Sequence, residues 1–209
     1  ARGCNANSVV EYVFCVLAIL ATKYGFDWRE LSYGIVGCGE IGSRLASRLL
    51  SLGIRVAIYD PLLDARHPLA EHFTDLDTVL AQNVISVHTP LTSEGTYPTW
   101  RLLDAARLKQ VAQGSILINA ARGGIIDESA LLARSTAQDG LLLVLDAWEN
   151  EPLIKPELAH RVELGTPHIA GYSREGKING TRMIAESFCQ HFGLQMPMPG
   201  TSGDAESPV

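Results

Sequence analysis

The sequence predicts an α/β fold in which helices cover both faces of a doubly wound parallel sheet. Short apolar runs alternate with amphipathic segments of helical spacing along most of the 209 residues. A glycine-rich turn separates the first apolar run from the helical segment that follows it. With 46% hydrophobic residues, the chain can also bury one substantial core. We therefore expect one α/β domain with flanking helices.

The glycine-rich turn is the motif around which the other elements are arranged. Residues 33–36 have the composition of a buried strand, and Gly37, Gly39 and Gly42 follow at the spacing of a dinucleotide-binding turn. In such a turn the three glycines allow a tight bend, close approach of a diphosphate to the backbone, and close packing of the helix on the strands. The sheet is therefore expected to be of the Rossmann type and to bind a dinucleotide.

Asp60 predicts which dinucleotide is bound. It ends the second apolar run, roughly 20 residues after the glycines, where a carboxylate accepts hydrogen bonds from the adenosine ribose. The same carboxylate repels the 2′-phosphate of NADP, so NAD is the expected cofactor. Glu40 and Ile41 start the helix and complete the cofactor-binding set. We expect only the backbone of Glu40 to contribute, since its acid group should point away from a diphosphate.

The remaining elements follow in order along the chain. Gly25 should end the first helix, which Asn7 or Ser8 would cap, and Asp127 should cap a later helix. Alternation of strands and helices implies right-handed crossovers, with ligands at the carboxyl ends of the strands. Helices are expected at residues 5–23, 76–81, 102–111, 128–137 and 174–192, and further strands at residues 84–87, 115–118, 141–145 and 162–164.

We divide the chain into four parts and expect a small metabolite as its partner. Residues 1–25 would be a linking helix, 26–172 the NAD-binding domain, 173–193 a return helix, and 194–209 a linker or disordered tail. The net charge of −6 and the absence of a basic run argue against nucleic acid or an anionic membrane. The apolar stretch 12–21 is too short to span a bilayer. Four scattered cysteines, without metal-ligand spacing, predict a cytoplasmic protein that holds no metal.

Three polar residues are candidates for chemistry. Arg122 offers a planar fork of donors for a carboxylate, with Gly123 and Gly124 leaving open space beside it; the alternative is a surface arginine that pairs with a helix end. His168 lies in a short loop before the last helix and is a candidate acid or base, or else a satisfied polar group. Glu151 follows the fifth strand and would fix the tautomer of His168 if the two side chains met, which spacing does not decide.

Four segments together resemble the D-isomer-specific 2-hydroxyacid dehydrogenases: the glycine turn and residues 119–127, 145–152 and 166–171. The resemblance implies an NAD-dependent oxidoreductase that acts on a CH–OH group. It makes Arg122 the substrate-orienting cation, His168 the acid/base and Glu151 its partner. It also implies that the cofactor is lined by Thr89, Asp146 and Gly171, and that Tyr172 reaches the substrate.

Further segments, among them residues 3–6, 88–91 and 168–177, resemble the members of that family that oxidise 4-phospho-D-erythronate to 3-hydroxy-2-oxo-4-phosphobutanoate in pyridoxine biosynthesis. The substrate implied is a small phosphorylated hydroxy acid, and the full-length protein a homodimer. Arg101 stands where the resemblance leads us to expect histidine. The alternatives are a phosphoglycerate-type dehydrogenase, a non-catalytic NAD-binding regulator, or a nucleotide domain without a function of its own.

The resemblance also implies a second lobe that binds the substrate and closes over the cofactor. The sequence lacks nearly all of such a lobe, so we expect a fragment that binds NAD without turning over substrate alone. We further expect apolar surface to be bare on the first and last helices, including Val13, Leu17 and Leu20 of the first.

Overall fold

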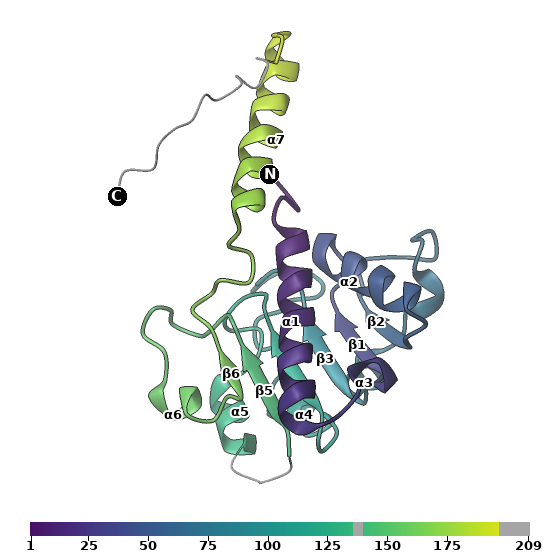
Figure 1. Cartoon of the computed structure of the whole chain (residues 1–209), viewed down its shortest axis with the longest axis vertical. Coiled ribbons are helices and arrows are strands. Elements are labelled where there is room, and N and C mark those ends of the chain that lie inside the picture. The colour runs from purple at the N-terminus through teal and green to yellow at the C-terminus, as the bar shows by residue number, and fades with distance from the viewer. Residues whose placement is uncertain (136–139, 197–209) are drawn as a thin grey trace.

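A computed structural model describes residues 1–135 and 140–196. Their strands form one six-stranded, all-parallel sheet in the order β2-β1-β3-β4-β5-β6 (Figure 1). The predicted Rossmann-type fold is confirmed. The strands are β1 (Tyr33–Val36), β2 (Val56–Tyr59), β3 (Val84–Val87), β4 (Ile116–Asn119), β5 (Leu142–Leu145) and β6 (Leu164–Gly165).

Helices cover both faces of the sheet. One face carries α1 (Ala6–Tyr24) and α2 (Glu40–Ser51), and the other carries α3 (Leu76–Leu80), α4 (Ala105–Leu108), α5 (Glu128–Ser135) and α6 (Pro156–Ala159). Successive strand residues point to opposite faces, so Ile35 packs in the first layer and Val36 in the second. Both faces are therefore buried, which explains why the strands have continuous apolar runs.

Helix α1 differs from its prediction in burial and in capping. By length and composition its 19 residues could cross a membrane, whereas the apolar stretch 12–21 alone is too short to do so. Its apolar side chains instead pack on the sheet, and Val13, Leu17 and Leu20 are buried. The expectation that these residues are bare is wrong, because the sheet face is wide enough to cover them. The N-cap residue is Asn5, before the expected cap. Ser8 lies within the helix, where its hydroxyl donates to Ser173 Oγ at 2.6 Å.

Helix α7 (Arg174–Phe192) extends away from the carboxyl end of the sheet (Figure 1). Ser173 caps it by accepting the N–H of Gly176. Gly176 packs against Asn5 in the segment before α1. Farther along, Ile184 and Phe188 are exposed. The expectation of bare apolar surface therefore holds for this helix.

Several connections were not predicted correctly. The helix expected at 102–111 shrinks to α4, because Arg101 has a positive φ of 50° and Leu103 instead forms a bridge with Ile126. Beyond β2, Phe73 forms a parallel bridge with Ile58, in a stretch for which no strand was expected. The structure also adds α6, η1 (Trp28–Glu30) and η2 (Ala70–His72). The predicted end of α5 at 137 and most of the predicted tail, 197–209, lie outside the described residues.

Candidate active site

The glycine turn lies where the chain changes direction in the sheet, between β1 and β3. Gly37 has a φ of +93°, and Gly42 packs so closely that a Cβ there would overlap the carbonyl oxygen of Gly37. Gly39 is different, because an added Cβ would find no atom within 4 Å. The first and third glycine are therefore needed for packing, whereas Gly39 borders open space at the N-terminus of α2.

Asp60 borders the same space from the end of β2. Its Oδ2 accepts the N–H of Cys38 at 2.8 Å and its Oδ1 accepts the N–H of Leu62 at 3.1 Å. With the glycine turn and Thr89 it lines a cavity of about 510 Å³. The carboxylate thus has the predicted position, and its contact with a ribose remains a prediction.

A neighbouring cavity of about 680 Å³ brings most of the predicted site residues together. It shares Gly39, His88, Thr89 and Pro90 with the first cavity. The predicted residues along its walls are Gly39, Glu40, Ile41, Thr89, Arg122, Asp146, His168, Gly171 and Tyr172. The two cavities form a cleft along the carboxyl ends of the strands, where parallel α/β sheets bind ligands.

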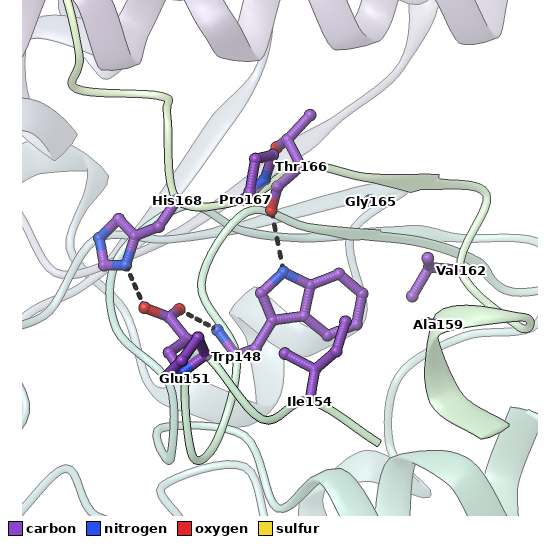
Figure 2. Close-up of a pocket in the computed structure, with 10 residues that line it drawn as sticks. Trp148, Glu151, Ile154, Ala159, Val162, Gly165, Thr166, Pro167 and His168 are labelled. Carbon is purple, nitrogen blue, oxygen red and sulfur yellow. Dashed lines mark hydrogen bonds and ion pairs between the residues drawn. The ribbon is translucent and has the colours of Figure 1, made fainter. Parts of the chain in front are cut away.

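His168 and Glu151 meet in the structure. Nδ1 of His168 lies 2.8 Å from Oε2 of Glu151, and Oε1 accepts the N–H of Trp148 at 2.7 Å (Figure 2). Burial acts to raise the pKa of Glu151, but the hydrogen bonds from Trp148 and His168, with the charge of Arg122, leave that pKa below its usual range. Within the described part of the chain, Nε2 of His168 has no hydrogen-bond partner, so this nitrogen is available to a ligand.

Asp146 holds the loop that presents His168. It is 1% exposed, and its Oδ1 accepts the hydroxyl of Thr166 and the N–H of Ile169, each at 2.7 Å, while Oδ2 accepts the N–H of Ala170 at 2.9 Å. His168 itself has a φ of +57°, a conformation that costs a non-glycine residue about 1–3 kcal/mol. The hydrogen bonds of Asp146 oppose that strain. This role was not predicted, and contact of Asp146 with a cofactor remains a prediction.

Arg122 is exposed at the wall of the cleft, where its Nη1 donates to the carbonyl of Ala121 at 2.6 Å. The predicted open space beside it is absent. A Cβ on Gly123 would overlap the carbonyl oxygen of Trp148, and a Cβ on Gly124 would overlap the ring of Trp100. The two glycines therefore serve to bring three segments into close contact.

Glu40 and Tyr172 both line the cleft. The Glu40 carboxylate lies against Gly3 and 3.4 Å from Nη2 of Arg44, which offsets its charge. Tyr172 is 71% exposed, and its ring lies 3.8 Å from Nζ of Lys177. A hydrogen bond from Lys177 and its positive charge lower the pKa of the Tyr172 hydroxyl. Contact of either residue with a ligand remains a prediction.

Two buried polar residues near the cleft were not singled out from the sequence. Asn119, at the end of β4, donates to the carbonyls of Arg122 and Ala147 at 3.0 and 3.4 Å. His88 directly follows β3; burial lowers its pKa to about 4, so it is neutral at pH 7. Its Nε2 lies 2.9 Å from Ser86 Oγ, while its Nδ1 and the Thr89 hydroxyl have no partner among the described residues. The sequence signal that could have identified both is a polar residue at the carboxyl end of an apolar strand.

Glu151 and His168 also line a further, mostly apolar cavity of about 460 Å³. Figure 2 shows the indole of Trp148 inside it, with the indole N–H donating to the carbonyl of Thr166 at 2.9 Å. Ile154 and Val162 form part of the wall. His168 thus borders both this cavity and the cleft.

The comparisons with known proteins agree with this geometry. Residues 20–170 match the family model described as D-isomer specific 2-hydroxyacid dehydrogenase, NAD binding domain. The chain is 48% identical over 196 residues to erythronate-4-phosphate dehydrogenase of Marinobacter nauticus, covering 93% of this chain and 51% of that protein. It is 46% identical over 195 residues to the enzyme of the same name from Cellvibrio japonicus, covering 93% and 50%.

The chain spans about half the length of the curated relatives it matches. Among solved structures, it resembles D-lactate dehydrogenase of Aquifex aeolicus complexed with NAD and lactic acid, with a TM-score of 0.68 and 28% identity over 89% of this chain and 67% of that one. The family match extends over the glycine turn, Arg122, Glu151 and His168. The chain therefore belongs to the D-isomer-specific 2-hydroxyacid dehydrogenase family, of which it contains the NAD-binding domain.

Proposed function

We propose that this chain supplies the NAD-binding and acid/base half of a dehydrogenase that oxidises a phosphorylated 2-hydroxy acid, with 4-phospho-D-erythronate as the substrate in pyridoxine biosynthesis. The observation that carries the proposal is the Glu151–His168 pair, whose free imidazole nitrogen belongs to the same cleft as Arg122. Substrate identity is taken from the relatives that are 46–48% identical.

The cleft suits a dinucleotide. Gly39 leaves room for a diphosphate at the N-terminus of α2, where free backbone N–H groups favour an anion. Asp60 lies at the far end of the cleft, as a ribose-binding carboxylate would. Thr89 has a buried hydroxyl without a partner among the described residues, which a bound ligand would satisfy.

The chemistry assigned to the side chains follows from their charges. Bound NAD would accept the hydride that leaves the substrate carbon. Arg122 would hold the substrate carboxylate by paired hydrogen bonds. Nε2 of His168 would take the hydroxyl proton, and the ionised Glu151 would stabilise the resulting imidazolium through Nδ1. In the reverse direction the same imidazolium would return the proton to a keto acid.

The test measures NADH formation in the protein that contains this chain, with 4-phospho-D-erythronate and, separately, 3-phosphoglycerate. His168→Ala should lower turnover by about 100-fold or more, the usual size of an acid/base contribution, and leave NAD affinity nearly unchanged. The rate of keto-acid reduction should fall above a limiting pH. Glu151→Gln should lower this limiting pH by roughly one unit, because a neutral amide no longer favours the imidazolium.

Each alternative has its own outcome. Faster turnover of 3-phosphoglycerate would identify a phosphoglycerate-type enzyme, and tight NAD binding without NADH formation would identify a regulator. Glu186→Gln is the matched control, since Glu186 is exposed on α7 and pairs only with Arg182. A pH profile that Glu151→Gln leaves unchanged would contradict the proposed acid/base pair.

The proposal includes the organisation of the whole protein. Residues 26–172 would bind NAD, residues 1–25 and 173–193 would connect to a substrate-binding lobe, and the full-length protein would be a cytoplasmic homodimer. Exposed apolar residues on α7, such as Phe188 and Phe192, support a connecting role for that helix. Sedimentation of the full-length protein would test its dimeric state.

A further inference from the structure

Glu128 is a buried acid outside the cleft. Only 3% of it is exposed, in the first turn of α5. Its Oε1 accepts the N–H of Glu149 at 2.6 Å, whereas its Oε2 has no hydrogen-bond partner in the described part of the chain. Glu149 is 8% exposed, and its Oε1 also lacks a partner there. Buried carboxyl groups are costly, so a residue of this kind calls for an explanation.

The hydrogen bond of Glu128 acts on the loop that carries Glu151. Trp148 and Glu149 donate successive N–H groups, the first to Glu151 and the second to Glu128. Lys155 makes a second connection between the first turn of α5 and the loop that carries Glu151. Its Nζ lies 3.0 Å from the Ser129 hydroxyl and 3.6 Å from Oε2 of Glu149. The loop therefore contacts the start of α5 both before Glu151, through Glu149, and after it, through Lys155.

The start of α5 is also the end of the segment that carries Arg122. Asp127 caps the helix through the N–H groups of Ser129 and Ala130. Five residues before Glu128, Gly123 packs against the carbonyl of Trp148. The Arg122 segment and the Glu151 loop therefore meet at Trp148 and Glu149, and Glu128 joins them there.

We propose that Glu128 is a positioning residue that, by accepting the Glu149 N–H, fixes the Glu151 loop against the Arg122 segment and so orients His168 through Glu151. The inference deepens the proposed function and rests on it for its consequence in turnover. The orientation itself exists without substrate and is measurable without it.

The acceptor atom of Glu128 is the essential feature, and its charge is not. Burial raises the pKa of Glu128; the Glu149 N–H and the charge of Lys155 oppose this, while the charges of Glu149 and Glu151 add to it, and the net effect is a raised pKa. Protonation on Oε2 would leave Oε1 free to accept the N–H of Glu149. Glutamine offers the same acceptor without any charge, so Glu128→Gln should preserve the position of the loop.

The test follows the Nδ1 resonance of the His168 imidazole by NMR in the 209-residue chain, at one fixed pH. Glu151→Gln sets the reference change, since it replaces the carboxylate that Nδ1 contacts. Glu128→Ala should move the resonance in the same direction as this reference, because a loosened Glu151 no longer stays in contact with Nδ1. Glu128→Gln should leave the resonance in place, and so should Glu157→Gln, which alters an exposed first-turn glutamate of α6.

A folded Glu128→Ala protein with an unchanged His168 Nδ1 resonance would overturn the proposal, and so would an equal change in Glu128→Gln. If Glu128→Ala does not fold, Glu128→Asp decides, since it keeps an acid group but withdraws the acceptor from Glu149. An unchanged Nδ1 resonance in Glu128→Asp overturns the proposal as well. If no substrate is turned over, the proposed function fails while the NMR result stands. If turnover is found, kcat should fall in Glu128→Ala and recover in Glu128→Gln.

Discussion

At the scale of single residues, Asp60 is expected to determine the preference for NAD over NADP. Its carboxylate already accepts two backbone N–H groups, which fix it at the edge of the cleft. Asp60→Ala should weaken NAD binding by about tenfold or more, since a hydrogen bond to a charged group contributes about 1.5–3 kcal/mol. NADP should lose less affinity, because the mutation also removes repulsion of its phosphate. Calorimetric titration of both cofactors measures the two changes.

The control for Asp60 is Asp64→Ala. Asp64 lies on the same loop, is exposed and pairs with Arg66, so its removal should alter neither cofactor affinity. Equal affinity of the unmutated chain for NAD and NADP would contradict the assignment of Asp60.

The sequence predicted where the site residues lie but not how they meet. Asp60, Arg122 and His168 each follow a strand, and parallel strands bring such positions to one edge of a sheet. The contact between Glu151 and His168 depends on the left-handed conformation of His168 and on three hydrogen bonds that the Asp146 carboxylate accepts, which no spacing rule describes. The role of Gly123 and Gly124 was misjudged because an absent side chain can mean open space or a close neighbour.

At the scale of elements, two glycines at the start of α2 should have different roles, one in the stability of the fold and the other in NAD binding. Gly42→Ala should destabilise the fold by about 1–3 kcal/mol, the usual cost of overpacking, because its Cβ would overlap the carbonyl of Gly37. Gly39→Ala should fold normally, since its Cβ meets open space, but should weaken NAD binding about tenfold or more by displacing the diphosphate. Thermal unfolding and calorimetry measure the two effects. A normal NAD affinity in Gly39→Ala would place the diphosphate elsewhere.

Element boundaries were predictable where local signals agreed with packing. The left-handed Gly25 ends α1 within one residue of the expected position, and α7 has the expected bounds. The helix expected at 102–111 is mostly replaced, because the bridge between Leu103 and Ile126 supplies hydrogen bonds that a helix would otherwise make. Tertiary pairing of this kind overrides helical periodicity.

At the scale of the whole molecule, two glutamates should give opposite pH dependences of stability. The pKa of Glu128 is raised on folding, so its contribution is fully present below its unfolded pKa and is lost as pH rises through the folded one. The pKa of Glu151 is lowered, so its contribution is present above its unfolded pKa and is lost as pH falls through the folded one.

Glutamine at either position removes one of these titrations, so thermal unfolding from pH 2.5 to pH 8 tests both signs in one series. The Tm of Glu128→Gln, relative to the unmutated chain, should rise as pH increases above the ordinary glutamate pKa, because the variant avoids the ionisation of a buried acid. The relative Tm of Glu151→Gln should fall as pH increases through the acidic end of the series, up to the ordinary glutamate pKa, because the variant lacks the carboxylate that Trp148 and His168 stabilise. A change of about 1 kcal/mol corresponds to roughly 2–4 °C for a chain of this size. Parallel curves for the two variants would show that these carboxyl groups do not have opposite shifts.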